Sequence, residues 1–269
     1  MNRGKIRKIV FINLILASFV FSSASHGDVL SNLVSNEAPE KIRSVLLSTP
    51  GLDVNKVYPG GVTLLMYAAA NNPNSAVIRL LVSHGADVNA KDDLGLTPLI
   101  FAVTTNKNVG AAYALLQLGA DPESTDAEGV SALMYAARDA GPQIMETLIS
   151  KNPDVNRGTK DGWTPLMFAA ASNGNARVAE LLLEAGAQIN AANSNGMTPL
   201  MLASERANNP EMLELLLRYS ADTTIRINGG TAVDFARRNP KLRNSSAFRN
   251  LETATRLRMS ENIRRAGIP

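Results

Sequence analysis

Nearly the same phrase occurs five times along this chain of 269 residues. Its copies read GGVTLLMYAA at 60–69, LGLTPLIFAV at 94–103, EGVSALMYAA at 128–137, DGWTPLMFAA at 161–170 and NGMTPLMLAS at 195–204. A hydroxyl residue recurs in these copies and in a weaker sixth one, at steps of 33 or 34 residues: Thr63, Thr97, Ser131, Thr164, Thr198 and Thr231. Such a period is typical of a repeat fold, in which each unit buries its apolar face by stacking on its neighbours.

A second marker follows each of the five copies. It reads HGADVN at 84–89, LGADPE at 118–123, KNPDVN at 151–156, AGAQIN at 185–190 and YSADTT at 219–224. Between the two markers, apolar residues recur with helical spacing, as at Val178, Leu181 and Leu182, which predicts a second amphipathic helix in each repeat. The glycine of the second marker suits a left-handed helix end. Asn152 and Ser220 replace it in two repeats.

The two motifs resemble the T-P-L-x-x-A-A and L-L-x-x-G-A-D-x-N signatures of ankyrin repeats over most of residues 60–236. The resemblance implies an all-α solenoid, with two antiparallel helices and a β-hairpin loop per repeat. We expect Thr164 to cap its helix and Pro165 to occupy the first helical position. Apolar residues replace the family's usual histidine after T-P-L, so we expect apolar packing there: Met66, Ile100, Met134, Met167 and Met201.

The terminal repeats must cover the ends of the stack. We expect an N-terminal capping repeat at 26–59, five full repeats at 60–227, and a C-terminal capping repeat with a basic tail at 228–269. Asp234 stands at the stacking position of the last repeat, where a charge suits a terminal unit. The segment from Lys241 to about Leu257 is expected to form the second helix of that repeat.

The first 25 residues have the three parts of a secretory signal peptide. MNRGKIRK is basic, IVFINLILASFVF is apolar and SSAS is a run of small residues. The apolar run is short for a membrane span, which needs about 20 residues, so we expect cleavage and no membrane span afterwards. An uncleaved signal anchor is the alternative. Since the chain has no cysteine, it is not a lipoprotein, and the resemblance indicates a bacterial protein that is periplasmic or secreted.

Charge is unevenly distributed along the chain. Removal of residues 1–24 changes the net charge from +3 to −1, and residues 237–269 hold nine basic and two acidic side chains. One hypothesis is that this tail binds an anionic lipid, a nucleic acid or an acidic partner. The other, which we favour because the charges are dispersed, is a solvated capping helix that complements the acidic repeats. Phe248 is the tail's only aromatic ring, so we expect no nucleic-acid binding.

No constellation of catalytic or metal-binding residues is evident. Outside the predicted signal peptide the only histidines are His26 and His84, and His84 lies at a helix end, where it can interact with the terminal carbonyls. The acidic residues Asp87, Asp121, Asp154 and Asp222 recur in phase with the repeats, which indicates a structural loop role. We therefore predict a protein that is not an enzyme and has no cofactor or metal.

The resemblance implies that a protein partner binds at the hairpin tips and the concave face formed by the first helices. Trp163, the only tryptophan, precedes a repeat threonine in the central repeat, and Leu96, Val130 and Met197 hold the same position in other repeats. We predict that these four form an apolar strip, although Trp163 could instead merely cover its own helix. The remaining candidates are Arg138, Asp139, Asp93, Glu128 and Lys160, with Asp92 and Asp126 as further acidic tips.

The predicted function is therefore that of a non-catalytic, monomeric protein–protein interaction module of the cell envelope or secreted space. Two alternatives remain: an accessory or effector protein that assists an enzyme, and a scaffold tethered to the membrane by an uncleaved signal anchor.

Overall fold

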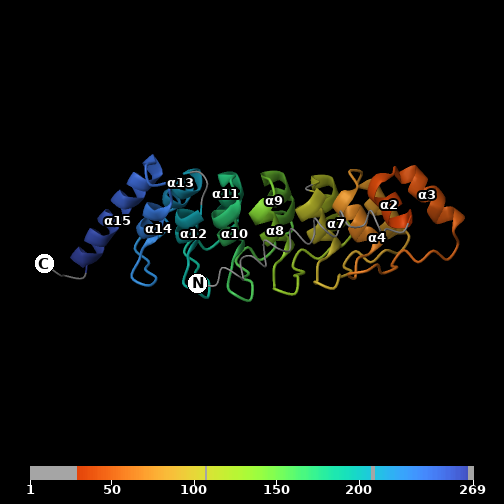
Figure 1. The fold of residues 1–269 in the computed structure, drawn as a ribbon, viewed down its shortest axis with the longest axis horizontal. Coiled ribbons are helices and arrows are strands. Elements are labelled where there is room, and N and C mark those ends of the chain that lie inside the picture. Colours follow the sequence, from red (N-terminus) through yellow and green to blue (C-terminus); the bar gives the residue numbers. More distant parts are fainter. Residues whose placement is uncertain (1–28, 107, 207–209, 266–269) are drawn as a thin grey trace. The chain divides into compact units, whose positions relative to one another are not determined.

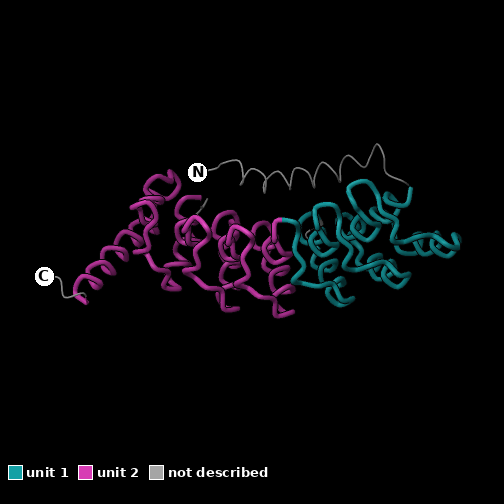
Figure 2. Tube along the Cα trace, turned by 90° about the horizontal axis from the view of Figure 1, so that it is seen from below, with its two compact units in different colours: residues 1–127 teal, residues 128–269 magenta. Residues whose placement is uncertain are grey.

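A computed structural model describes residues 29–106, 108–206 and 210–265 (Figure 1). Within these ranges the chain forms helices and no strands, and isolated bridges pair Tyr58 with Val62 and Ile227 with Gly230. The chain divides into two compact units, unit 1 at 1–127 and unit 2 at 128–269 (Figure 2). The predicted signal peptide, residues 1–25, lies outside the described residues.

Unit 1 consists of helix pairs joined by loops. Its elements are α2 (Val29–Asn36), α3 (Pro39–Ser48), α4 (Leu64–Asn71), α5 (Ala76–Ser83), α6 (Pro98–Phe101), the π-helical turn η1 (Ala102–Asn106) and α7 (Val109–Gln117). The first helices pack in the order α2, α4 and then α6 with η1, and the second helices pack in the order α3, α5, α7. Each pair therefore covers the pair before it in the chain. Helices α2 and α3 form the pair at the N-terminal end, where the capping repeat was predicted.

Unit 2 has the same two-layer arrangement. Its helices are α8 (Ala132–Asp139), α9 (Pro142–Ile149), α10 (Pro165–Ser172), α11 (Ala176–Glu184), α12 (Pro199–Arg206), α13 (Glu211–Arg218), α14 (Ala232–Arg238) and α15 (Ser246–Arg265). One layer contains α8, α10, α12 and α14, and the other contains α9, α11, α13 and α15. The predicted all-α ankyrin-repeat architecture is confirmed. The last helix begins at Ser246 and reaches Arg265, further than the expected end near Leu257.

Apolar packing fills the position where a histidine was expected from the family pattern. The side chains there are at most 1% exposed: Met66, Ile100, Met134, Met167 and Met201. At the same position of the last repeat, Asp234 is half-buried, and its Oδ2 accepts a hydrogen bond of 2.8 Å from the Thr231 amide. Because the Thr231 amide at the start of α14 satisfies the Asp234 carboxylate, the last repeat needs no apolar neighbour at this position.

Hydroxyl capping of the first helices holds in most repeats but not at Thr164. The hydroxyls of Thr97, Ser131 and Thr198 accept from the amide three residues later at 3.3–3.4 Å. Thr164 is the N-cap residue of α10 as predicted, but the expected hydroxyl bond is missing: its Oγ1 is buried and has no hydrogen-bond partner among the described residues. The reason is that the Met167 amide donates instead to the carbonyl oxygen of Thr164, at 3.0 Å.

The left-handed helix ends occur where the second marker predicts them. Gly85, Gly119 and Gly186 have φ values of 92°, 93° and 92°. Asn152 and Ser220 take the same conformation with φ values of 52° and 63°. This conformation costs non-glycine residues more, and asparagine tolerates it better than most because its short polar side chain can bond locally.

A hydrogen-bonded aspartate organises the hairpin turn before α6. The Asp92 Oδ1 accepts from the amides of Leu94 at 2.9 Å and Leu96 at 2.7 Å. Burial is the main cause that raises the pKa of Asp92, and the charges of Asp93 and Asp126 add to it. In unit 2, Asn193 holds the corresponding position, and its Oδ1 accepts from the amides two and four residues later at 3.0 Å. The turn therefore needs an acceptor oxygen but no charge.

We expect Asp92→Asn to raise the urea midpoint of unfolding at pH 7. Because the folded-state pKa of Asp92 is raised, its ionised form destabilises the fold at neutral pH, and the penalty disappears as the pH falls through that raised pKa. The gain over wild type should therefore shrink as the pH approaches about 4, where free aspartic acids titrate. The control is Asp93→Asn, an exposed neighbour, which should change little. A lower midpoint for Asp92→Asn at pH 7 would contradict this explanation.

Candidate functional site

The predicted apolar strip is not an exposed surface. Leu96, Val130 and Met197 are only 1%, 2% and 5% exposed. The residue before a helix cap often packs on the fourth residue of that helix, and the row has this spacing. In the central repeat the Trp163 and Phe168 ring centroids lie 5.3 Å apart. The three buried side chains therefore add little accessible apolar surface beside Trp163, and the strip as a partner-binding surface stays a prediction.

Trp163 is the member of the row that stays partly exposed. Its hairpin holds it in place, since its carbonyl accepts from the Thr159 amide at 3.0 Å and its amide donates to the Thr159 hydroxyl at 3.1 Å. The indole packs on Phe168, and the guanidinium of Arg206 lies 5.8 Å from the ring centroid. An aromatic ring held from several sides loses little conformational freedom when it binds a partner.

An ion pair lies at the end of α8, and another lies at the end of α12. The Arg138 Nε lies 2.6 Å from the Asp139 Oδ2, and the Arg138 guanidinium lies 5.1 Å from the centroid of the Tyr135 ring. In α12 the Arg206 Nε lies 3.2 Å from the Glu205 Oε2. Arg138 is 7% exposed, whereas Asp139, Glu205 and Arg206 remain partly accessible. Both ends therefore present polar groups whose positions are already fixed.

Small residues lie between these two ion pairs. Ala171 and Ser172 of α10 occupy the repeat positions that Arg138 and Asp139 hold in α8. Because α10 packs against α8 on one side and α12 on the other, the small residues separate the charged ends. We call this group the Trp163 site and list its members: Trp163, Arg138, Asp139, Ala171, Ser172, Glu205 and Arg206. It offers an aromatic ring, flanking charges and an exposed serine, which suits recognition of a partner surface.

The predicted hairpin-tip residues differ in exposure. Asp93, Glu128 and Lys160 are exposed. Backbone hydrogen bonds connect adjacent hairpins within each unit; for example, the Lys160 amide donates to the Glu128 carbonyl at 3.4 Å. Asp126 is 7% exposed, so its prediction as an accessible acidic tip is wrong. It stands at the same turn position as Asp92, 34 residues later in the chain. Glu128 and Lys160 belong to unit 2, as does the Trp163 site.

His84 lies at the helix end as expected. Its Nδ1 is 2.9 Å from the carbonyl oxygen of Leu80. In the described part of the chain, no group of three or more acidic or histidine side chains could hold a metal ion. Within the same residues, no helix combines the length and the hydropathy needed to cross a membrane.

The sequence and structural comparisons identify the class of protein. The family model described as "Ankyrin repeats (3 copies)" matches residues 30–126 and 133–227, so the chain belongs to the ankyrin-repeat family. Ankyrin repeats are generally protein–protein interaction modules and are typically non-catalytic. No curated protein sequence matches the chain.

Two solved structures share the fold. The human ASB11 ankyrin repeat domain is 25% identical, with a TM-score of 0.72, and the match covers 84% of this chain and 97% of that one. The second is a chain from the structure entitled "Bd0816 Predatory Endopeptidase from Bdellovibrio bacteriovorus in complex with immunity protein Bd3460". It is 26% identical, with a TM-score of 0.62, and the match covers 71% of this chain and 98% of that one.

Proposed function

We propose that this protein is a non-catalytic binding module that holds one protein partner on the Trp163 site. The site supports this proposal because it combines a positioned aromatic ring with ordered charges and small residues within one unit. Hot spots of protein interfaces are enriched in tryptophan, tyrosine and arginine and are surrounded by groups that exclude water. The observation that carries the proposal is that Trp163 stays partly exposed while Leu96, Val130 and Met197 are buried.

We further propose that the module acts in the envelope or secreted space of a bacterium. The support is the basic, apolar and small-residue order of the first 25 residues, which is typical of a secretory signal. A membrane-tethered scaffold is the alternative if the apolar segment is retained. In both cases the binding unit is on the far side of the inner membrane.

A second candidate function is that of an accessory protein whose partner is an exported enzyme. A chain from a complex of an endopeptidase with an immunity protein resembles this chain over 71% of its length, and that resemblance favours the candidate. It would make the present protein a modulator that occupies a surface of the enzyme. The Trp163 site would supply the contacts in this case too, so both candidates predict the same binding residues.

Site-specific photo-crosslinking in intact cells tests the proposed function. A photoreactive amino acid at Ser172, which is exposed in the middle of the Trp163 site, should crosslink to one protein, and the adduct should be in the envelope or secreted fraction. The matched control is the same probe at Glu184, an exposed residue at the end of α11 in the other helix layer. Equal crosslinking from both positions, or none from Ser172, would refute the placement of the partner.

A further inference from the structure

The last helix continues well beyond the packed core of unit 2. Helix α15 has 20 residues, whereas the other second helices of unit 2, such as α11 and α13, have 8 or 9. Its buried residues are Ala247, Phe248, Leu251 and Thr255. No residue from 256 to 265 is buried, so the second half of the helix adds no side chain to the core.

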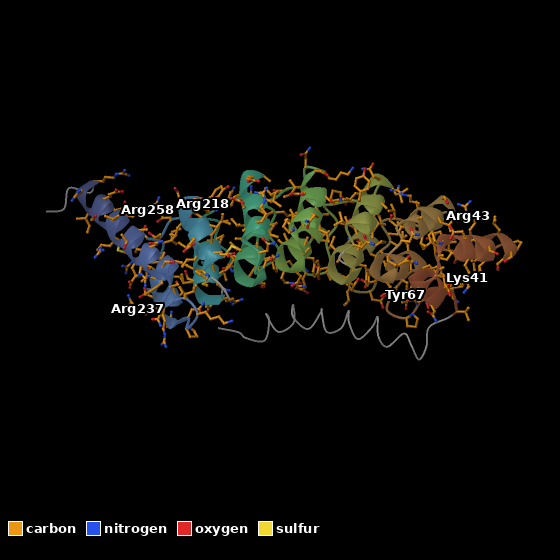
Figure 3. All side chains as sticks on the ribbon, turned by 90° about the horizontal axis from the view of Figure 1, so that it is seen from above. Lys41, Arg43, Tyr67, Arg218, Arg237 and Arg258 are labelled. Atoms are coloured by element: carbon orange, nitrogen blue, oxygen red, sulfur yellow. The ribbon has the colours of Figure 1, made fainter. Side chains whose placement is uncertain are left out.

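One arginine holds this half of α15 against the preceding repeat. The Arg258 Nη1 donates to the Ala221 carbonyl at 2.9 Å and lies 3.7 Å from the Asp222 Oδ1. Seen from above, Arg258 and Arg218 appear along one edge of unit 2 and Arg237 along the opposite edge (Figure 3). Arg258 therefore holds one side of this extension, residues 256–265 of α15, against the preceding repeat. The other side of the extension faces α14.

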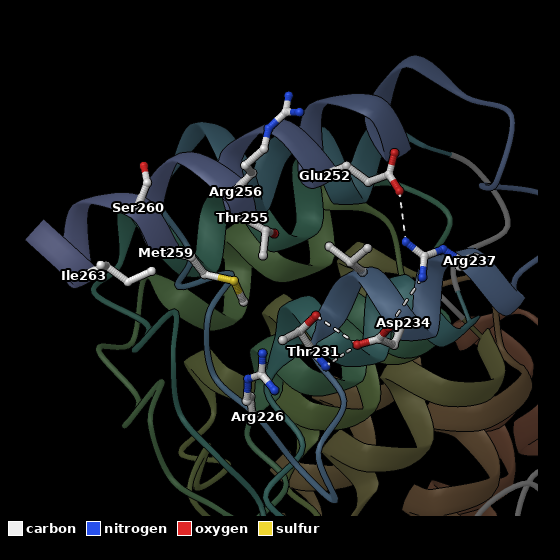
Figure 4. A pocket seen from close by; sticks show the side chains of 11 residues that line it. Arg226, Thr231, Asp234, Arg237, Glu252, Thr255, Arg256, Met259, Ser260 and Ile263 are labelled. Atoms are coloured by element: carbon white, nitrogen blue, oxygen red, sulfur yellow. Dashed lines mark hydrogen bonds and ion pairs between the residues drawn. The ribbon is translucent and has the colours of Figure 1, made fainter. Parts of the chain in front are cut away.

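An open groove of about 540 Å³ lies between α14 and the extension of α15 (Figure 4). Val233 of α14 and Met259 and Ile263 of α15 provide its apolar lining. Ile263 is 49% exposed, although it lines the groove. A partly exposed apolar lining at the end of a stack leaves surface that another element could cover.

The charges around the groove are unequally satisfied. Both acidic residues of the groove form ion pairs with Arg237, whose guanidinium lies 3.7 Å from the Asp234 carboxylate and 3.1 Å from the Glu252 carboxylate. Arg226 donates to the Gly229 carbonyl at 3.3 Å. Neither Arg226 nor Arg256 forms an ion pair with a described residue. Both residues line the groove, and the Arg256 guanidinium projects from α15 away from α14 (Figure 4). The groove thus combines an apolar floor with two arginines at its rim that have no carboxylate partner among the described residues.

We propose that this groove binds an acidic amphipathic helix of a partner protein. A helix is the expected occupant because α14 is the last first-layer helix, and each earlier one in unit 2 is covered by the next helix of its layer. Apolar side chains of the partner would cover Met259 and Ile263 beside the buried Val233, and its carboxylates would pair with Arg226 and Arg256. Arginine suits this role because it stays charged and presents several donors to a carboxylate. This surface is distinct from the Trp163 site.

The probe is a synthetic peptide of about 18 residues, with leucines at helical spacing on one face and glutamates on the others. Its affinity for the full-length protein is measured by fluorescence anisotropy. Ile263→Glu should weaken binding at least about tenfold, since it places a charge on the apolar floor. The matched control is Leu257→Glu, since Leu257 is 58% exposed on the same helix but does not line the groove.

The charge contacts are tested in the same assay. Arg256→Glu should also weaken binding about tenfold or more, whereas Arg249→Glu, on the packed half of α15, should change it little. A scrambled peptide of equal charge without the leucine face should bind weakly. Equal binding of both peptides, or binding unaffected by Ile263→Glu, would overturn the proposal. Groove-dependent binding to anionic vesicles or self-association in sedimentation, without peptide binding, would also overturn it.

Discussion

Replacement of Leu166 by alanine is expected to lower the free energy of unfolding by about 2–5 kcal/mol. The Leu166 side chain is 0% exposed in α10, which packs between α8 and α12 of unit 2. Truncation removes apolar contacts and leaves a cavity, and helices held on both sides cannot move freely to close it. Leu182, also 0% exposed in the second helix of the same repeat, should show a similar loss.

Urea unfolding followed by circular dichroism measures this loss, with Leu257→Ala as the control. Leu257 is 58% exposed, and its truncation should change the free energy of unfolding by less than about 0.5 kcal/mol. Indistinguishable midpoints for Leu166→Ala and Leu257→Ala would mean that Leu166 is not part of a packed core.

Local sequence signals predicted most of the fold. The repeat period of 33 or 34 residues predicted where the helix pairs lie. This was possible because the apolar spacing of a helix and the residues of a turn are local sequence signals. Asn152 is a clear example: it replaces glycine at a position where the backbone needs positive φ, and the structure gives it a φ of 52°. Apolar residues stand where the family usually has histidine, and the prediction that they are buried is confirmed, as at Met134 and Met167.

The exposure of the candidate binding residues could not be read from their position alone. Leu96, Val130 and Met197 precede their helix caps as Trp163 does, but their burial depends on how each hairpin folds over its helix. The spacing between Trp163 and Phe168 was the available signal, because residues before a cap pack on the fourth helical residue. Only the larger indole remains partly outside.

Two other features depend on competition between groups. The Thr164 hydroxyl lost its expected acceptor role because the Met167 amide bonds to the Thr164 carbonyl, a choice that composition does not specify. The dispersed charges of the basic tail indicate a solvated helix, and no local pattern in the sequence indicates the groove. The groove arises because Met259 and Ile263 share a face of α15 that lies opposite α14.

Trp163→Ala is expected to weaken binding of the partner crosslinked from Ser172 by about thirtyfold or more. That factor corresponds to about 2 kcal/mol, the usual lower bound for an interface hot spot. The ring packs on Phe168 and under Arg206, so its loss should also lower the melting temperature somewhat. The matched control is Tyr113→Ala, which removes an aromatic side chain that is 51% exposed on α7.

The decisive measurement is the dissociation constant of that partner for wild type, Trp163→Ala and Tyr113→Ala, each at a temperature where circular dichroism shows the protein folded. Binding through the Trp163 site predicts a large loss for Trp163→Ala and an unchanged constant for Tyr113→Ala. An unchanged constant for folded Trp163→Ala would show that the tryptophan only covers its own helix, and would place the partner elsewhere on the protein.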